Sequence, residues 1–208
     1  MKPKQESSLK EKINTMPKLK NINTTILSKE WATLNRVDYD FQFKDGSWKR
    51  ISRESYDRGD GTCILLYNVE KNTVILTKQF RMPAYINNKN DGMSIEVCAG
   101  AMDKNEDAET CIIREVEEEV GYKIKEATKV LEAYTSPGAV TEKMYLFIAA
   151  YTDAMKINEG GGLESENEEI EVLEVPFSKA VEMINNQEII DAKTIMLLQY
   201  AQINKLLQ

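Results

Sequence analysis

With 208 residues, of which 42% are hydrophobic, the chain is long enough to bury a core of its own. Its formal net charge of −7 argues against a nucleic-acid-binding surface, because such domains carry a basic face that neutralises phosphates. The chain contains no histidine. This excludes Ser-His and Cys-His catalysis and His-ligated zinc, so a general base would have to be a carboxylate, lysine, tyrosine or cysteine.

The first 20 residues are rich in Lys, Glu and Ser and predict a flexible N-terminal tail. This segment lacks the apolar stretch of a secretion signal, and the longest apolar run, residues 144–151, is too short to span a bilayer. We therefore expect a cytoplasmic protein without a membrane partner. Cys63, Cys98 and Cys111 lie in apolar segments without metal-ligand spacing, which predicts buried, reduced thiols.

Residues 21–60 alternate between apolar and polar side chains on both sides of a turn at residues 44–46. This pattern predicts a small N-terminal region of antiparallel strands. Residues 61–208 predict a mixed α/β domain. Its expected strands are 62–69, 73–80, 94–100, 127–134, 143–151 and 170–175, and its expected helices are 106–120, 177–186 and 191–206.

The segment from residue 100 to residue 122 fits the pattern G-x5-E-x7-R-E-U-x-E-E-x-G-U, in which U is apolar, at every specified position. With average residue usage, seven identities and two apolar positions coincide on the order of once per 10^8 windows. In an α-helix each residue is rotated by about 100° from the one before, so Glu115, Glu118 and Glu119 fall within an arc of about 100°. Cys111 and Ile112 lie on the same arc, which indicates that this side of the helix faces the core.

This clustering of carboxylates predicts a metal site. Glu115 and Glu119 are a like-charge pair at the C-terminal end of a helix, where the dipole is already negative, and a divalent cation would remove that penalty. Oxygen ligands alone suit Mg²⁺ or Mn²⁺, ions that also bridge phosphates. The alternative is a solvated run of charges. The nine matched positions and the shared arc favour the metal site.

The segment resembles the catalytic box of Nudix hydrolases. The flanking segments RESYDRGDG, TKQFR, EVCAG, YTSPGAVTE, ENEEIEVLEVPF and IIDAKT extend the resemblance to bacterial GDP-mannose pyrophosphatases and their ADP-ribose-cleaving relatives, over residues 24–206. The resemblance implies an α/β class Nudix fold, an α/β/α sandwich around a mixed sheet, with a small N-terminal antiparallel β appendage. It also implies a homodimer in which the appendage at 21–60 is swapped, so that each active site receives residues from both chains.

The resemblance implies the following roles for residues of the box and of the acidic loop at 158–169. Arg114 would orient a glutamate of the helix, and Glu166 would deprotonate the attacking water, with Glu168 as the alternative base. Gly160, Gly161 and Gly162 would give the loop freedom to move. The alternative is an acidic loop without function. The implied magnesium ligands are the Ala99 carbonyl, Glu115, Glu119 and Glu168, with Glu118 in support.

For substrate contacts, the resemblance implies that Trp31 stacks on the nucleobase. Considered alone, Arg53 would be an exposed strand residue, and the sequence Ser136-Pro137-Gly138 would be an ordinary turn. Asp191 can cap the last helix, which places Lys193 in the first turn of that helix. A cation there opposes the helix dipole, and a contact with the substrate would explain why a lysine occupies this position. The other implied substrate-binding residues are Ser52, Arg53, Glu54, Arg81, Gly100, Glu142 and Lys193.

The expected function is Mg²⁺-dependent hydrolysis of the diphosphate bond of a nucleoside diphosphate-sugar. GDP-mannose, cleaved to GMP and mannose 1-phosphate, is favoured over ADP-ribose, cleaved to AMP and ribose 5-phosphate. A non-catalytic Nudix sensor of nucleotide sugars would predict a damaged box, and an acidic scaffold would predict stability that is indifferent to Mg²⁺ and nucleotide. The intact carboxylates favour the enzyme.

Overall fold

A computed structural model describes residues 18–88, 91–163, 165 and 167–208, and residues 1–17 of the expected tail lie outside the described residues. The chain divides into two compact units. The first comprises the chain up to Arg58 together with Gly138–Thr141, and the second comprises Gly59–Pro137 together with Glu142–Gln208.

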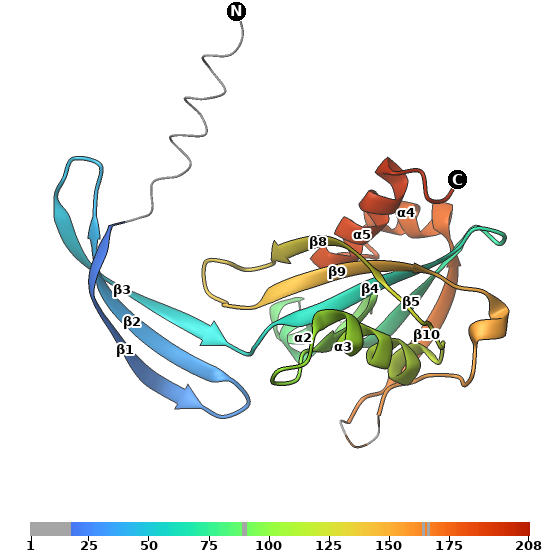
Figure 1. The fold of residues 1–208 in the computed structure, drawn as a ribbon, viewed down its shortest axis with the longest axis horizontal. Coiled ribbons are helices and arrows are strands. Elements are labelled where there is room, and N and C mark those ends of the chain that lie inside the picture. The colour runs from blue at the N-terminus through green and yellow to red at the C-terminus, as the bar shows by residue number, and fades with distance from the viewer. Residues whose placement is uncertain (1–17, 89–90, 164, 166) are drawn as a thin grey trace, which may run out of the picture. The chain divides into compact units, whose positions relative to one another are not determined.

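The first unit is a three-stranded antiparallel sheet in the order β1-β2-β3, within the part of the chain that the structure describes (Figure 1). The predicted turn joins β2 to β3: Gly46 has a φ of +85°, and the Asp45 carboxylate accepts the Ser47 N–H at 2.9 Å. The predicted antiparallel appendage is thus confirmed, although its first strand begins at Leu19 rather than at residue 21. The strands are β1 (Leu19–Lys29), β2 (Thr33–Gln42) and β3 (Trp48–Asp57).

The second unit contains a mixed sheet of seven strands among the described residues, with the path β10-β5-β4-β9-β8, where β6 pairs with β5 and β7 pairs with β4. Strands β4 and β9 run parallel, and the other pairs are antiparallel. The strands are β4 (Gly61–Asn68), β5 (Thr73–Phe80), β6 (Met93–Glu96), β7 (Cys98–Ala101), β8 (Thr128–Tyr134), β9 (Lys143–Ala150) and β10 (Ile170–Pro176).

Helices cover both faces of this sheet, as expected for an α/β/α sandwich (Figure 1). Alternate residues of β4 belong to different core clusters. Cys63 and Leu65 pack with residues of α4 and α5, whereas Ile64 and Leu66 pack with residues of α3 and η1. The helical segments are α2 (Met82–Asn88), α3 (Ala108–Glu115), the π-helical turn η1 (Val116–Val120), the 3₁₀ turn η2 (Asp153–Met155), α4 (Phe177–Asn185) and α5 (Ala192–Ile203).

The structure differs from the sequence prediction in two places that matter for the site. The expected strand at 94–100 is divided at Val97, because β6 and β7 pair with different neighbours and the Val97 N–H is donated to Thr194 Oγ1 at 2.8 Å. Helix α2 was not predicted. Cys63, Cys98 and Cys111 are buried free thiols, as expected. None of the helices in the described ranges is long and apolar enough to cross a membrane.

Candidate active site

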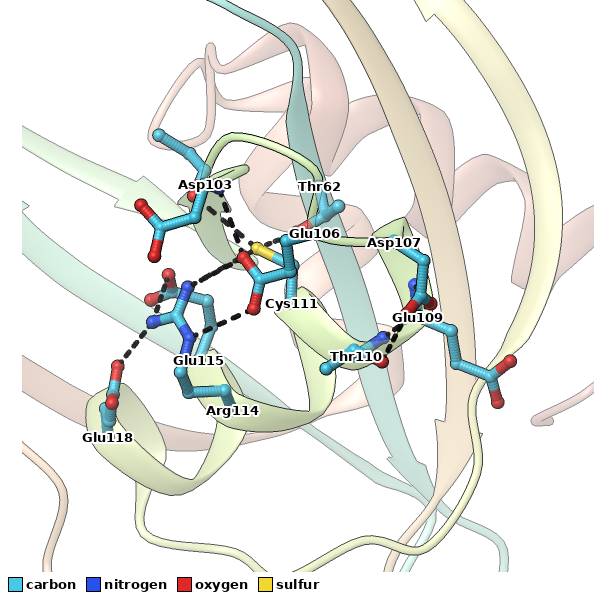
Figure 2. Close-up of polar contacts among 11 residues, drawn as sticks. Thr62, Asp103, Glu106, Asp107, Glu109, Thr110, Cys111, Arg114, Glu115 and Glu118 are labelled. Carbon is cyan, nitrogen blue, oxygen red and sulfur yellow. Dashed lines mark hydrogen bonds and ion pairs between the residues drawn. The ribbon is translucent and has the colours of Figure 1, made fainter.

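Helix α3 packs on the sheet and contains charged residues of the box. Asp107 caps its N-terminus, since its carboxylate accepts the N–H groups of Glu109 at 3.1 Å and Thr110 at 3.0 Å (Figure 2). Cys111 and Ile112 are fully buried one turn further on. These contacts fix the start and the rotation of the helix, and thereby the position of the charged residues that follow.

The expected α-helix over 106–120 is wrong at its C-terminal end, because Val116–Val120 form a π-helical turn. The arc of 100° per residue therefore does not extend past Val116. Glu119 is 2% exposed, whereas the side chain of Glu118 is 26% exposed and bonds to Arg114. The helix therefore presents one fully buried carboxylate, Glu119, and one largely buried carboxylate, Glu115, whose side chain is 12% exposed. Such π-helical turns are frequent at functional sites.

The two buried carboxylates lie against β7. A Cβ atom on Gly100 would be 2.1 Å from Glu115 Cδ, so only glycine leaves room for this side chain. Glu119 Oε2 accepts the Ala99 N–H at 3.1 Å. The structure thus brings Ala99, Gly100, Glu115 and Glu119 together.

Arg114 binds the glutamates around it (Figure 2). Its Nη1 lies 2.8 Å from Glu118 Oε2 and 2.9 Å from Glu115 Oε1, and its Nη2 lies 3.4 Å from Glu106 Oε2. These charge-assisted bonds raise the pKa of Arg114 despite its partial burial, and they fix Glu118 and Glu115. Arg114 thus contacts two glutamates of the helix, and its orienting role stays a prediction.

Burial makes ionisation of the two inner carboxylates unfavourable. It raises the pKa of Glu115 to about 7 although Arg114 opposes the shift, with Glu118 and Glu168 adding to the rise. Burial likewise raises the pKa of Glu119 to about 7, against hydrogen bonds from Cys98 and Ala99 and with the charges of Glu115 and Glu168 adding to it. A cation at this position would stabilise the ionised carboxylates.

The acidic loop is docked on the π-helical turn. The N–H groups of Gly161 and Gly162 donate to the carbonyls of Glu119 at 2.8 Å and Glu118 at 3.2 Å. Gly160 has a φ of +69°, and a Cβ atom there would be 2.4 Å from the Glu119 carbonyl oxygen. The glycines at 160 and 162 therefore allow the loop to pack closely against this turn and against Glu168.

Glu168 is at the end of this loop. Its Oε2 accepts the Leu163 N–H at 3.2 Å, and a Cβ atom on Gly162 would lie 2.6 Å from the same oxygen. Glu168 is close enough to raise the pKa values of both Glu115 and Glu119. Glu166, the predicted base, lies outside the described residues.

Two of the predicted substrate-binding residues, Arg81 and Lys193, converge on Glu96. Arg81 donates to both Glu96 oxygens from Nε and Nη2, each at 2.9 Å, and Lys193 Nζ donates to Glu96 Oε2. Asp191 caps α5, as predicted, and accepts a bond from Lys193 at 2.9 Å. Glu142 is half-buried in the same unit.

The remaining predicted substrate-binding residues belong to the first unit. Trp31 is 77% exposed, and the Arg58 guanidinium lies 5.0 Å from the centre of its ring. Arg53 is exposed and donates to the Ser52 carbonyl at 2.8 Å. The Ser52 side chain also hydrogen-bonds Asp38, and Glu54 is exposed.

The donor set near β7 fits a hard divalent cation. Its donors are carboxylate and main-chain oxygens, the chain contains no imidazole, and the neighbouring Cys98 is a buried thiol that bonds to Glu119. Within the described ranges, no three Asp, Glu, Cys or His side chains are already converged on one point as metal ligands. Instead, Glu115 pairs with Arg114 and Glu119 with the Ala99 N–H.

Sequence reasoning missed Glu96, which is 3% exposed and joins Arg81 to Lys193. The signal was present in the segment SIEVCAG, where a single charged residue stands in an otherwise apolar strand. Glutamate is rarely fully buried unless it is paired. Its partners, however, come from the end of β5 and from α5, which no local pattern connects to it.

Comparisons with known proteins agree with this description. The NUDIX domain model matches residues 57–198, and the model of the GDP-mannose pyrophosphatase NudK N-terminal domain matches residues 18–56. A GDP-mannose pyrophosphatase of Cronobacter sakazakii is 52% identical over 182 residues, covering 88% of this chain and 94% of that protein. One of Escherichia coli O157:H7 is 49% identical over 186 residues, covering 89% and 96%. A crystal structure of an ADP compounds hydrolase has a similar fold, with a TM-score of 0.66, 17% identity and coverage of 91% and 96%.

Proposed function

The chain belongs to the Nudix hydrolase family, and from this premise we propose that it hydrolyses the diphosphate bond of a nucleoside diphosphate-sugar. The favoured substrate is GDP-mannose, which would give GMP and mannose 1-phosphate, in line with the names of relatives that match almost their full length. The observation that carries the proposal is the pair of carboxylates against β7: Glu115, largely buried against Gly100, and Glu119, fully buried on the Ala99 N–H. A non-catalytic sensor would not need to keep them.

The proposed cofactor is Mg²⁺, with Mn²⁺ as a possible substitute. The proposed ligands are the Ala99 carbonyl, Glu115, Glu119 and Glu168, all oxygen donors of the kind that Mg²⁺ prefers. When bound, the ion would neutralise charge on the diphosphate. The raised pKa values of Glu115 and Glu119 support this assignment, because a cation removes the cost of their buried charge.

The chain's own residues would position the reactants. Arg114 would hold Glu118 and Glu115 in place through the bonds described above. Glu166, with Glu168 as the alternative, would take the proton of the water that attacks phosphorus. Gly100, Glu142, Arg81 and Lys193 would contact the substrate, and the arginine fork suits phosphate oxygens. Trp31, Ser52, Arg53 and Glu54 would recognise the nucleotide.

We further propose a cytoplasmic homodimer in which the N-terminal β region, residues 21–60, is swapped between the two chains. The first unit supports this with apolar side chains exposed along β1: Leu19 is 43%, Ile22 60%, Ile26 59% and Leu27 45% exposed. Contiguous exposed apolar residues commonly mark an interface between proteins.

Product analysis on a panel of substrates tests the activity. The panel contains GDP-mannose, ADP-ribose, other nucleotide sugars, NADH, diadenosine polyphosphates and a nucleoside triphosphate, with Mg²⁺ and with a chelator. We expect GDP-mannose to be cleaved fastest and the chelator to stop turnover. Turnover of none of the diphosphates would refute the proposal, and preference for ADP-ribose would correct the substrate.

Glu115→Gln tests the metal ligands. We expect it to lower turnover by about 100-fold or more while the fold is kept, because the variant loses a ligand charge but keeps the side-chain volume. Glu117→Gln is the matched control, since it makes the same change at an exposed position two residues further along the chain. Full turnover by Glu115→Gln would contradict the ligand role.

A further inference from the structure

Glu96 is a buried carboxylate outside the box, and two cations bind it. It is 3% exposed at the end of β6. Arg81 binds it with two parallel bonds of 2.9 Å, and Lys193, whose side chain is 13% exposed, binds the Oε2 atom. A paired fork of this kind fixes the plane of the guanidinium as well as its distance.

Three elements meet at this carboxylate. Arg81 directly follows β5, which pairs with β6 through Thr77 and Glu96. Lys193 lies in the first turn of α5, and its neighbour Thr194 accepts the N–H of Val97 at 2.8 Å. The start of α5 is therefore bound to the break between β6 and β7 by two adjacent contacts, and the positions of both cations depend on Glu96.

The arrangement is costly for stability alone. Burying charges carries a desolvation penalty that well-packed apolar residues of similar size would avoid. Lys193 also stands at a helix N-terminus, where a cation opposes the dipole. The ion pairs with Asp191 and Glu96 offset the cost of this lysine at the helix N-terminus. Stability alone therefore does not explain why a lysine occupies position 193.

The cluster borders the proposed metal site. Glu96 is three positions before Ala99, and Arg81 is close enough to Glu119 for that charge to raise its pKa. The pair with Glu96 uses Nε and Nη2 of Arg81 and leaves its Nη1 outside the pair, and the Arg81 side chain is 42% exposed. One edge of the guanidinium is thus anchored, while another part of the side chain reaches solvent.

We propose that Glu96 is a positioning residue that holds Arg81 and Lys193 together as one cationic site for the diphosphate of the substrate. The inference rests on the proposed function for the identity of the substrate. Without the carboxylate, Arg81 would lose the pair that fixes its guanidinium and Lys193 would be held by Asp191 alone, so the diphosphate would meet two cations that are no longer held together.

Steady-state kinetics of the full chain with GDP-mannose and Mg²⁺ test the proposal. Glu96→Gln is expected to raise KM about 10-fold or more and to change kcat by less than about threefold, because binding is weakened while the reacting groups stay in place. Glu174→Gln is the matched control. It makes the same change in another network, where Glu174 binds Lys71, Thr73 and Tyr151. Both variants are expected to have a lower Tm than the wild type, but only Glu96→Gln should change KM. A wild-type KM in Glu96→Gln overturns the proposal.

A double-mutant cycle shows whether Glu96 acts through Arg81. In an Arg81→Ala background, Glu96→Gln should raise KM by clearly less than it does in the wild-type chain, because one of its two partners is gone. Effects that simply multiply would overturn the positioning role. If Glu96→Gln fails to fold, Glu96→Asp replaces it in the test. This variant keeps the charge on a shorter side chain that cannot reach both cations. An unchanged KM in Glu96→Asp would also refute the proposal.

Binding of inorganic pyrophosphate separates this inference from the proposed function. Calorimetry with Mg²⁺ should show about 10-fold weaker binding to Glu96→Gln than to the wild-type chain. If the wild type cleaves no nucleotide sugar but pyrophosphate binding depends on Glu96, the proposed function fails and the inference stands. If GDP-mannose is cleaved while neither KM nor pyrophosphate binding depends on Glu96, the inference fails alone.

Discussion

At the scale of single residues, the second unit places carboxylates in two opposite electrostatic environments. Glu115 and Glu119 are buried beside each other, and burial raises their pKa values to about 7. Burial also acts to raise the pKa of Glu96, but the bonds from Arg81 and the charge of Lys193 lower it to about 2. The first environment would be stabilised by a metal ion, whereas the second already has its cations.

The lowered pKa of Glu96 predicts how stability depends on pH. The pKa of this carboxyl is near 4.5 in the unfolded chain and about 2 in the folded one. Its contribution to the free energy of unfolding is therefore complete above pH 4.5 and is lost as the pH falls towards 2. The difference corresponds to about 3 kcal/mol. Urea unfolding of the wild type and Glu96→Gln between pH 6 and about 3 should show a smaller loss of stability with acid in the variant. Parallel profiles would contradict this.

At the scale of elements, the junction between α3, η1 and the acidic loop forms the site. The π-helical turn rotates Glu119 inward and leaves Glu118 partly exposed beside Arg114. The loop then binds the free carbonyls of this turn through the N–H groups of Gly161 and Gly162. Helix ends require such partners for their last carbonyls. The loop that carries Glu168 is therefore attached to the helix that carries the other carboxylates.

Substitution of Gly160 should separate loop and helix. Gly160→Ala is expected to cost about 2–4 kcal/mol, because the positive φ disfavours alanine and its Cβ atom would overlap the Glu119 carbonyl. Turnover by Gly160→Ala should also fall, because the loop that carries Glu168 would be displaced. Gly46→Ala is the control, since Gly46 has a φ of +85° but nothing within 4 Å of a Cβ atom, and should cost only about 1–2 kcal/mol. Both variants are compared with the wild type by thermal and urea unfolding. An equal loss of stability in Gly160→Ala and Gly46→Ala would argue against the close contact at Gly160.

At the scale of the whole molecule, the chain consists of two units of unequal size. The larger contains the proposed metal ligands and the cluster around Glu96, and the smaller contains Trp31 and the strand residues predicted to recognise the nucleotide. The segment Gly138–Thr141 belongs to the smaller unit, where the Tyr56 N–H donates to the Ala139 carbonyl at 2.8 Å. The predicted turn at residues 136–138 thus lies where the chain passes from one unit to the other.

The proposed dimer can be tested on β1. Ile26→Asp should weaken self-association by about 100-fold or more, because it would bury a charge in an apolar interface, and the mean mass measured by sedimentation should shift towards the monomer. Thr25→Asp is the matched control, since neighbouring side chains of a strand point to opposite faces. A wild-type chain that sediments as a monomer at all concentrations would refute the dimer.

The sequence by itself determined the family-defining box, the alternating strands of both units, the last two helices and the Asp191 cap. These features depend on neighbours a few positions apart, where spacing alone states which side chains share a face. It also identified Glu115 and Glu119 as candidate ligands, although it grouped Glu118 with them by assuming an α-helix through residue 120.

Only the tertiary structure decided the features that depend on distant segments. Glu96 and Lys193 are 97 positions apart, and the break at Val97 exists because Thr194 supplies the hydrogen bond that a continuous strand would have made elsewhere. The π-helical turn and the close fit of Gly160 likewise depend on the loop that packs against them. Contacts of this kind arise when buried polar groups must find partners, and a pattern of neighbouring residues does not contain that information.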